Sequence, residues 1–316
     1  MRLSSKLLLM AGIGLLSIAC KKDQKSDQTE QSTDNSAVVV SQLGDTLVAP
    51  APSEKLLARF EEKKAVFEAD PNLENTIWYG RFMAYIGNYR EAIAIYTEGL
   101  ERFPDNSRLL RHRGHRYITV REFERAIQDL EKARQLIQGK ENMIEQDGMP
   151  NAQNIPVSTM HGNIYYHLGL AYYLDRQLPK ALEAYKTCLK TSRHADNVVS
   201  ATHWIYMIQN RMSRKQAADN YLRNITTDMN VIENHTYYKA CLFYKGLISE
   251  GEAIAPDENG NGPNSAMKYA LGNYYYYNGQ HDLAEQYFDD ILSGDDWNSF
   301  GYIAAETEKV KPYIYR

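Results

Sequence analysis

From about residue 53 onward, small, aromatic and aliphatic residues recur along the chain at helical spacing. In the clearest stretch, Gly114 is followed by Tyr117, Phe123, Ala126 and Leu130, at offsets of three, nine, twelve and sixteen residues. Such offsets place the small residues where two antiparallel helices approach closely, and the large residues fill the adjoining space. The pattern predicts a helical hairpin.

The same offsets recur in several other parts of the sequence. The recurrences begin at Gly80, Gly169, Gly272 and, more weakly, Ile205. The first period is 34 residues, and the 55 residues from Gly114 to Gly169 leave an insertion of 21 residues beyond one period. The interval before Gly272 leaves room for one degenerate unit, whose first helix we expect at 235–250.

This pattern resembles the tetratricopeptide repeat (TPR), in which each unit is two helices in about 34 residues. The resemblance covers about 240 residues, from Pro71 to Lys311. It implies an all-α fold, a right-handed α-solenoid of about five hairpins within a domain at 53–316. We expect helices at Lys55–Phe67 and Ser299–Val310 to cap the two apolar ends of the stack. Several segments are also similar to bacterial repeat proteins of unassigned activity, which implies no reaction.

The first twenty residues have the character of a signal peptide. Arg2 and Lys6 precede an apolar run at Leu7–Ile18, which as a helix would span roughly 18 Å, short of the ~30 Å hydrocarbon layer. Its end, Ser17-Ile-Ala-Cys20, resembles the lipobox of bacterial lipoproteins. That resemblance implies removal of residues 1–19 and acylation of Cys20; the alternative is ordinary secretion with a coincidental cysteine.

Residues 20–52 are polar and lack helical periodicity, so we predict a disordered tether after the lipidated cysteine. The expected location is the cell envelope. The outer membrane or the periplasmic face of a Gram-negative-type envelope fits a lipoprotein best.

In this repeat class the first helix of each unit lines a concave groove. The resemblance therefore assigns a set of groove residues that is basic at its N-terminal end and aromatic and amide-rich further on. These residues are Arg81, Arg108, Arg111, His115, Tyr166, Tyr173, Tyr206, Gln209, Tyr269, Asn273 and Tyr276. Guanidinium groups suit carboxylates or phosphates, whereas tyrosine and asparagine suit peptide backbone or sugars. The alternative is that the arginines pair with acids such as Glu91, Glu98 and Asp105 and that the tyrosines fill the core.

Other constellations favour no metal or cofactor. His112 and His115 lie one helical turn apart, but neighbouring arginines would oppose a cation. The stretch 257–262 opens like an EF-hand loop but has Lys268 at its twelfth position. We expect Cys188 and Cys241 to be buried free thiols, with a disulfide between them as the alternative.

The insertion between the second and third units falls at 139–160. Two prolines exclude a continuous helix there, and loops of this length are usually functional or disordered. Its apolar residues are too many for a solvated linker, so we predict an ordered segment folded over the groove. The alternative is a strap on the convex side.

Composition narrows the function without naming a ligand. The chain has 316 residues, 36 Lys plus Arg against 40 Asp plus Glu, and 24 tyrosines. A formal charge of −4 argues against nucleic-acid binding, and no GxSxG, P-loop or GxGxxG motif occurs. The sequence favours a non-enzymatic, lipid-anchored module that binds a protein or peptide. The alternatives are a solute-binding lipoprotein that holds a glycan or small anion, and an enzyme that uses a His/Arg cluster under the insertion.

Overall fold

The computed structural model describes residues 38–256 and 260–311. The predicted signal peptide, the lipobox-like stretch and the first part of the predicted tether lie outside the described residues. The described residues form fourteen α-helices and one two-stranded antiparallel hairpin, and the structure is 66% helical. None of these helices combines the length and the hydrophobicity that a bilayer crossing requires.

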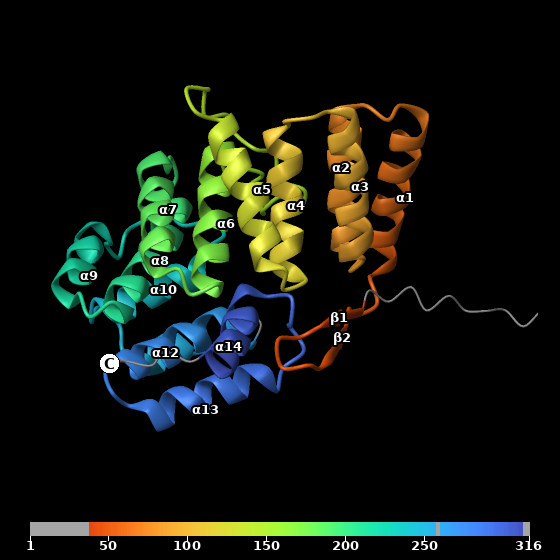
Figure 1. Cartoon of the computed structure of the whole chain (residues 1–316). Helices are drawn as coiled ribbons and strands as arrows, with labels where there is room; N and C mark the ends of the chain where they lie inside the picture. The colour runs from red at the N-terminus through yellow and green to blue at the C-terminus, as the bar shows by residue number, and fades with distance from the viewer. Residues whose placement is uncertain (1–37, 257–259, 312–316) are drawn as a thin grey trace, which may run out of the picture. The chain divides into compact units, whose positions relative to one another are not determined.

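The helices form consecutive antiparallel pairs, as the repeat pattern predicts (Figure 1). The pairs are α2 (Leu73–Tyr85) with α3 (Tyr89–Arg102), α4 (Ser107–Thr119) with α5 (Phe123–Leu136), α6 (Met160–Leu174) with α7 (Leu178–Thr191), α8 (Ala195–Arg211) with α9 (Lys215–Tyr221), and α12 (Ser265–Tyr277) with α13 (His281–Leu292). The degenerate unit has a first helix, α10 (His235–Tyr244), and only a short second one, α11 (Glu250–Ile254).

The glycines of the pattern lie where the two helices of each pair touch. A Cβ on Gly114 would lie 2.8 Å from Leu130, and one on Gly169 would lie 2.7 Å from the ring of Tyr185. Both contacts join a glycine to the residue sixteen positions later, the offset in the sequence pattern. Any larger side chain at these glycines would push the paired helices apart.

The N-terminal cap is observed as α1 (Glu54–Ala69), which begins at the N-cap Ser53 and packs against α2. Phe60 and Phe67 of α1 lie against the ring of Tyr79, at centroid distances of 5.9 and 4.9 Å. The helix therefore buries an aromatic face of the first unit.

The predicted C-terminal capping helix is observed as α14 (Phe300–Val310), which packs chiefly against α12 and α13 of the last unit. It also contacts α6 of the third unit. Ile303, Ala304 and Ala305 are fully buried, and a Cβ on Gly301 would lie 2.7 Å from the backbone nitrogen of Ala266. The helix is therefore more deeply buried than a cap with one side in water.

The predicted tether is wrong over its last part. Strands β1 (Val38–Val40) and β2 (Thr46–Val48) pair as a hairpin in which Val39 and Leu47 are buried. Trp297 donates a hydrogen bond to the carbonyl of Val48 at 2.9 Å, and Gln42 donates one to the hydroxyl of Thr307 at 2.8 Å. Alternating apolar residues here fold against the C-terminal part of the chain, which pattern analysis of the tether alone does not reveal.

Candidate functional site

Two of the three arginines predicted to recognise an anion, Arg81 and Arg111, are bound to the 139–160 insertion. A guanidinium nitrogen of Arg81 donates to the carbonyl of Gln146 at 2.8 Å, and one of Arg111 lies 3.2 Å from the carboxylate of Glu145. Both arginines are buried, and both partners belong to the 139–160 insertion. The insertion therefore lies across the first helices of units one and two, and the convex-side alternative is wrong.

Glu145 is the centre of this contact. Its side chain is buried, accepts a hydrogen bond from Asn163 at 2.7 Å, and lies 3.1 Å from Nε2 of His112. Burial raises the pKa of this carboxyl, but the nearby Arg111 and His112 outweigh that effect and hold the pKa below its ordinary value. Glu145 is thus ionised at neutral pH, and it neutralises Arg111 from within the chain.

The insertion is ordered but is not held by its apolar residues. Met143, Ile144, Met149 and Ile155 are exposed, whereas Val157 is buried. Polar contacts and one isolated bridge between Ile144 and Thr159 hold the segment instead. Arg108, at the rim, pairs with Glu74 at 3.1 Å. The acids that bind these arginines are therefore not the ones the sequence suggested.

The aromatic end of the predicted groove is buried. The hydroxyls of Tyr173 and Tyr269 are hydrogen-bonded at 2.6 Å, and the amide of Asn273 donates to the hydroxyl of Tyr173 at 3.0 Å. Tyr269 donates to Glu308 of α14 at 2.8 Å, and Arg211 donates to Asn273 at 2.6 Å. Because α14 covers these side chains, they form an internal polar network and do not line an open groove.

The remaining predicted groove residues divide between the core and partly exposed positions. Tyr206 and Gln209 are buried, and burial raises the pKa of Tyr206 to about 12. Tyr276 lies beneath the guanidinium of Arg211, 3.9 Å from it to the ring centre. The hydroxyl of Tyr166 donates to that of Tyr237 at 3.1 Å and accepts from Trp204 at 3.0 Å.

Two neighbouring cavities remain on the inner face. The larger has a volume of about 340 Å³ and is lined by α2, α4 and the starts of α3 and α14. The smaller, of about 260 Å³, is lined by α4, α6, α7, α8 and α10 and by the segment before α10. His115 and Phe300 line both, with ring centroids 5.5 Å apart. His115 is thus the one predicted groove residue that lines the larger cavity.

The larger cavity differs from the smaller one because the side chain of Arg116 lines it. Among the residues that the structure describes, no hydrogen bond or ion pair engages its guanidinium group, which lies 5.6 Å from the ring centre of Tyr89. Burial lowers the pKa of Arg116, although guanidinium groups stay protonated in proteins. The cavity therefore contains a positive charge that no described acid neutralises.

The histidines beside this charge are neutral. The rings of His115 and His167 lie 4.1 Å apart between centroids, and Nδ1 of His167 is 2.7 Å from the carbonyl of Asn163. Burial lowers the pKa of His115 well below its ordinary value, and burial together with Arg111 lowers that of His167 to about 3. Neither ring adds charge to the cavity at neutral pH.

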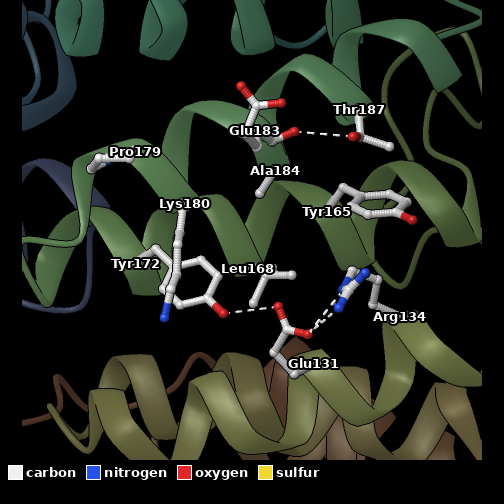
Figure 2. A pocket seen from close by; sticks show the side chains of 10 residues that line it. All are labelled: Glu131, Arg134, Tyr165, Leu168, Tyr172, Pro179, Lys180, Glu183, Ala184 and Thr187. Atoms are coloured by element: carbon white, nitrogen blue, oxygen red, sulfur yellow. Dashed lines mark hydrogen bonds and ion pairs between the residues drawn. The ribbon is translucent and has the colours of Figure 1, made fainter.

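A larger hollow lies elsewhere, on the outer side between α5, α6 and α7. Figure 2 shows this groove of about 570 Å³, in which Glu131 reaches toward both Arg134 and Tyr172. Glu131 accepts from Arg134 at 2.9 Å and from Tyr172 at 2.8 Å, and Lys180 lies over the ring of Tyr172. Its acidic and basic groups engage one another, so it is a weaker candidate for ion recognition than the inner cavity.

The described residues contain no group of three or more His, Cys, Asp or Glu side chains placed to hold a metal ion. The EF-hand-like stretch lies partly outside the described residues. Cys188 and Cys241 are buried free thiols, as predicted, and the disulfide alternative is wrong.

No family model matches the sequence, and no curated protein matches it. The chain is similar to YrrB, described as a TPR protein with an unusual peptide-binding site, at 16% identity and a TM-score of 0.42, over 79% of this chain and 99% of that one. It is similar to a TPR protein from Parabacteroides merdae at 18% identity and a TM-score of 0.47, over 80% of this chain and 92% of that one. It is also similar to the thermophilic TPR protein TTC0263 of Thermus thermophilus at 14% identity and a TM-score of 0.40, over 74% of this chain and 98% of that one. These likenesses concern the architecture alone.

The chain is an α-solenoid of tetratricopeptide-type hairpins, as predicted. Sequence analysis missed Arg116, although it selected the neighbouring His115. Its position could have indicated it, because Arg116 follows Gly114 by two residues and lies on the same helix as Arg111 and His115. Only the structure shows that Arg111 is neutralised while Arg116 is not.

Proposed function

We propose that this protein is a non-enzymatic, lipid-anchored helical-repeat module that binds a protein or peptide partner at its inner face. The observation that supports this is the cavity at Arg116, where a guanidinium group faces open volume without an acidic partner among the described residues. An uncompensated charge in a partly desolvated cavity gains stability from a ligand of opposite sign. The partner inserts one group there and makes its other contacts around the opening.

A binding role fits the titratable groups of the two cavities better than catalysis does. General bases work best with a pKa near the operating pH, and both histidines have a pKa far below it. Burial raises the pKa of the Cys188 thiol to about 12, which removes its nucleophilic form at neutral pH. The His/Arg cluster therefore binds and does not catalyse in our proposal.

The anchor in this proposal is a lipid on Cys20, and the location is the outer membrane or the periplasmic face of the envelope. Replacing Cys20 with Ser should move the mature protein from the membrane fraction to the soluble fraction. Detection of the substituted protein in the membrane fraction would reject the lipid anchor while leaving the binding proposal intact.

The alternative is a solute-binding lipoprotein. The cavity volumes favour it, because about 340 and 260 Å³ hold one small molecule or a few side chains and not an extended peptide. In that case the ligand would be bound entirely within the cavities, without a protein at the opening.

Site-specific photo-crosslinking separates the two functions. A photoreactive residue at Asn298, which is exposed and lines the larger cavity, should give a discrete protein adduct in intact cells. The matched position is Glu183, which is exposed in the outer groove and should give none. An adduct only at Glu183 would reject the inner face as the partner site. Absence of any protein adduct at Asn298 would favour the solute-binding alternative.

A further inference from the structure

The lining of the larger cavity carries one positive unit. Arg116 supplies it, no Asp or Glu occurs among the lining residues that the structure describes, and His115 is uncharged at neutral pH. Arg111 is paired with Glu145. Arg81 keeps its charge but is not a lining residue, and it donates at 3.3 Å to the hydroxyl of Tyr85, which is one.

Neutral donors surround this charge. The hydroxyl of Tyr89 accepts a hydrogen bond from Asn298 at 2.8 Å, so its own hydrogen is available to a ligand. Tyr85 also lines the cavity, and its hydroxyl accepts from Arg81 at 3.3 Å, which leaves its hydrogen available too. The helix α14, eleven residues long, begins at the cavity after the N-cap Ser299, and the amide groups of a helix start favour a negative ligand.

We propose that this cavity is a carboxylate-binding site, in which Arg116 pairs with one carboxylate and the hydroxyls of Tyr85 and Tyr89 donate to it. The inference rests on the proposed function, since it names the group that the partner inserts. A carboxylate carries one negative charge and fits the planar guanidinium fork. A phosphate dianion would bring a second negative charge, which no other cation in the cavity lining compensates, since the two histidines are neutral.

The walls of the cavity indicate what lies next to the carboxylate. Phe300 lies between the two cavities and approaches the rings of His115 and Tyr166, at centroid distances of 5.5 and 6.2 Å. An aromatic or aliphatic group beside the carboxylate would pack against these rings. The carboxylate has two sources with this chemistry, the C-terminus or an acidic side chain of a peptide, and a free organic acid.

The test measures binding to the purified full chain by isothermal titration calorimetry. The probes are phenylacetate, its neutral isostere phenylacetamide, inorganic phosphate, and the peptide acetyl-Ala-Phe with a free or an amidated C-terminus. Wild type should bind the carboxylates and not the amides. The Arg116→Gln variant should bind the carboxylates at least about tenfold more weakly, as expected for a lost charged hydrogen-bond pair, and Arg116→Lys should fall between them.

The matched control is Arg90→Gln, which removes an exposed arginine that pairs with Glu122 outside the cavity and should leave carboxylate binding unchanged. Far-UV circular dichroism checks that each variant is folded. If Arg116→Gln does not fold, Tyr89→Phe takes its place, with an expected loss of severalfold. Equal binding of phenylacetate and phenylacetamide, tighter binding of phosphate, or unchanged binding by Arg116→Gln would each overturn the inference.

The sources and the two levels of the proposal are separable. Tighter binding of the free-carboxylate peptide than of phenylacetate assigns the carboxylate to a peptide, and the reverse assigns it to a free acid. If Arg116→Gln leaves the adduct at Asn298 unchanged, the carboxylate inference fails while the binding function stands. If carboxylates bind but no protein adduct forms, the partner function fails while the carboxylate site stands.

Discussion

Two regions of the inner face neutralise their arginines in different ways. In units one and two, Arg111 pairs with Glu145, which belongs to an insertion whose apolar residues are mostly exposed. In the C-terminal half, Arg176 and Arg211 lie 3.1 and 3.2 Å from Glu308, which belongs to a helix with a buried apolar face. In both regions an acid from a distant part of the chain pairs with arginines.

The difference lies in what else holds each acid. Around Glu308, hydrophobic burial and the ion pairs stabilise the same arrangement, so α14 is part of the core. Around Glu145, polar contacts supply most of the attachment, and such a segment can open locally at lower free energy. The arginines paired with Glu308 therefore belong to the folded core, whereas Arg111 is covered by a segment that local opening could displace.

The largest expected effect is at Glu308. Replacing it with Gln removes this carboxylate from two guanidinium groups, and we expect the free energy of unfolding to fall by about 3–5 kcal/mol. Urea unfolding followed by circular dichroism measures this. The matched variant is Glu285→Gln, which removes an exposed partner of Lys309 and should change stability by less than about 1 kcal/mol. Equal effects of the two variants would show that α14 is not part of the core.

The Glu145→Gln variant should have a smaller effect. Arg111 and His112 lose their acidic partner, but the insertion can move and admit water, so we expect a loss of about 1–3 kcal/mol. Proteolytic cleavage between residues 146 and 156 should become faster. Glu141→Gln, at an exposed position of the same insertion, is the control. A stability loss as large as that of the Glu308 variant would contradict the distinction between the two regions.

Acid should destabilise the protein through its buried histidines. Burial lowers the pKa of His203 to about 3, and burial and Arg111 do the same for His167. The unfolded chain binds these protons near pH 6.5 and the folded chain does not, so their contribution is complete above that pH and is lost as the pH falls. Each should contribute a slope of about 1.4 kcal/mol per pH unit below 6.

Urea unfolding at several pH values between 7.5 and 5 measures this slope. The His203→Gln variant should lose one histidine's share of it. A slope that is unchanged in the variant would show that His203 is protonated in the folded state. The carboxyls with lowered pKa, Glu145 and Glu308, should contribute only below about pH 4.5, where the unfolded carboxyls become protonated.

The smallest effect concerns the N-terminal hairpin. Gln42 donates to the hydroxyl of Thr307 at 2.8 Å and to the carbonyl of Ile303 at 3.3 Å. Gln42→Ala should therefore lower stability by about 0.5–1.5 kcal/mol, measured by thermal unfolding. Gln153→Ala, at an exposed position of the insertion, should leave the unfolding temperature unchanged. A larger loss at Gln153 would mean that the insertion is held more firmly than the hairpin.

The repeat units could be predicted from the sequence because their signal is local. Gly114 and Leu130, or Gly169 and Tyr185, are sixteen residues apart and meet within one hairpin, so spacing alone identifies the contact. The position of α14 could not be predicted in this way. Its partners at Arg121 and Arg176 are more than 130 residues away in the chain, and helical periodicity carries no information on such pairings.

The candidate site shows the same division. The sequence identified the inner-facing arginines as a group, and their residue type suggested anions. It did not show that Arg111 is paired with Glu145, an acid from the segment predicted as a lid, nor did it select Arg116. The position of a distant carboxylate decides the role of each arginine, and it follows from the tertiary fold.

The closure by α14 has a consequence for how this solenoid could vary in length. Open repeat arrays gain or lose whole units easily, because each unit contacts only its neighbours. Here Arg121, at the turn of the second unit, binds Glu306, and Arg176, at the turn of the third, binds Glu308. Both turn residues adopt positive φ angles of 65° and 63°, a conformation that side chains other than glycine rarely take. An added or deleted unit between them would move one arginine away from its glutamate, so insertion or loss of a repeat there is incompatible with the closed form.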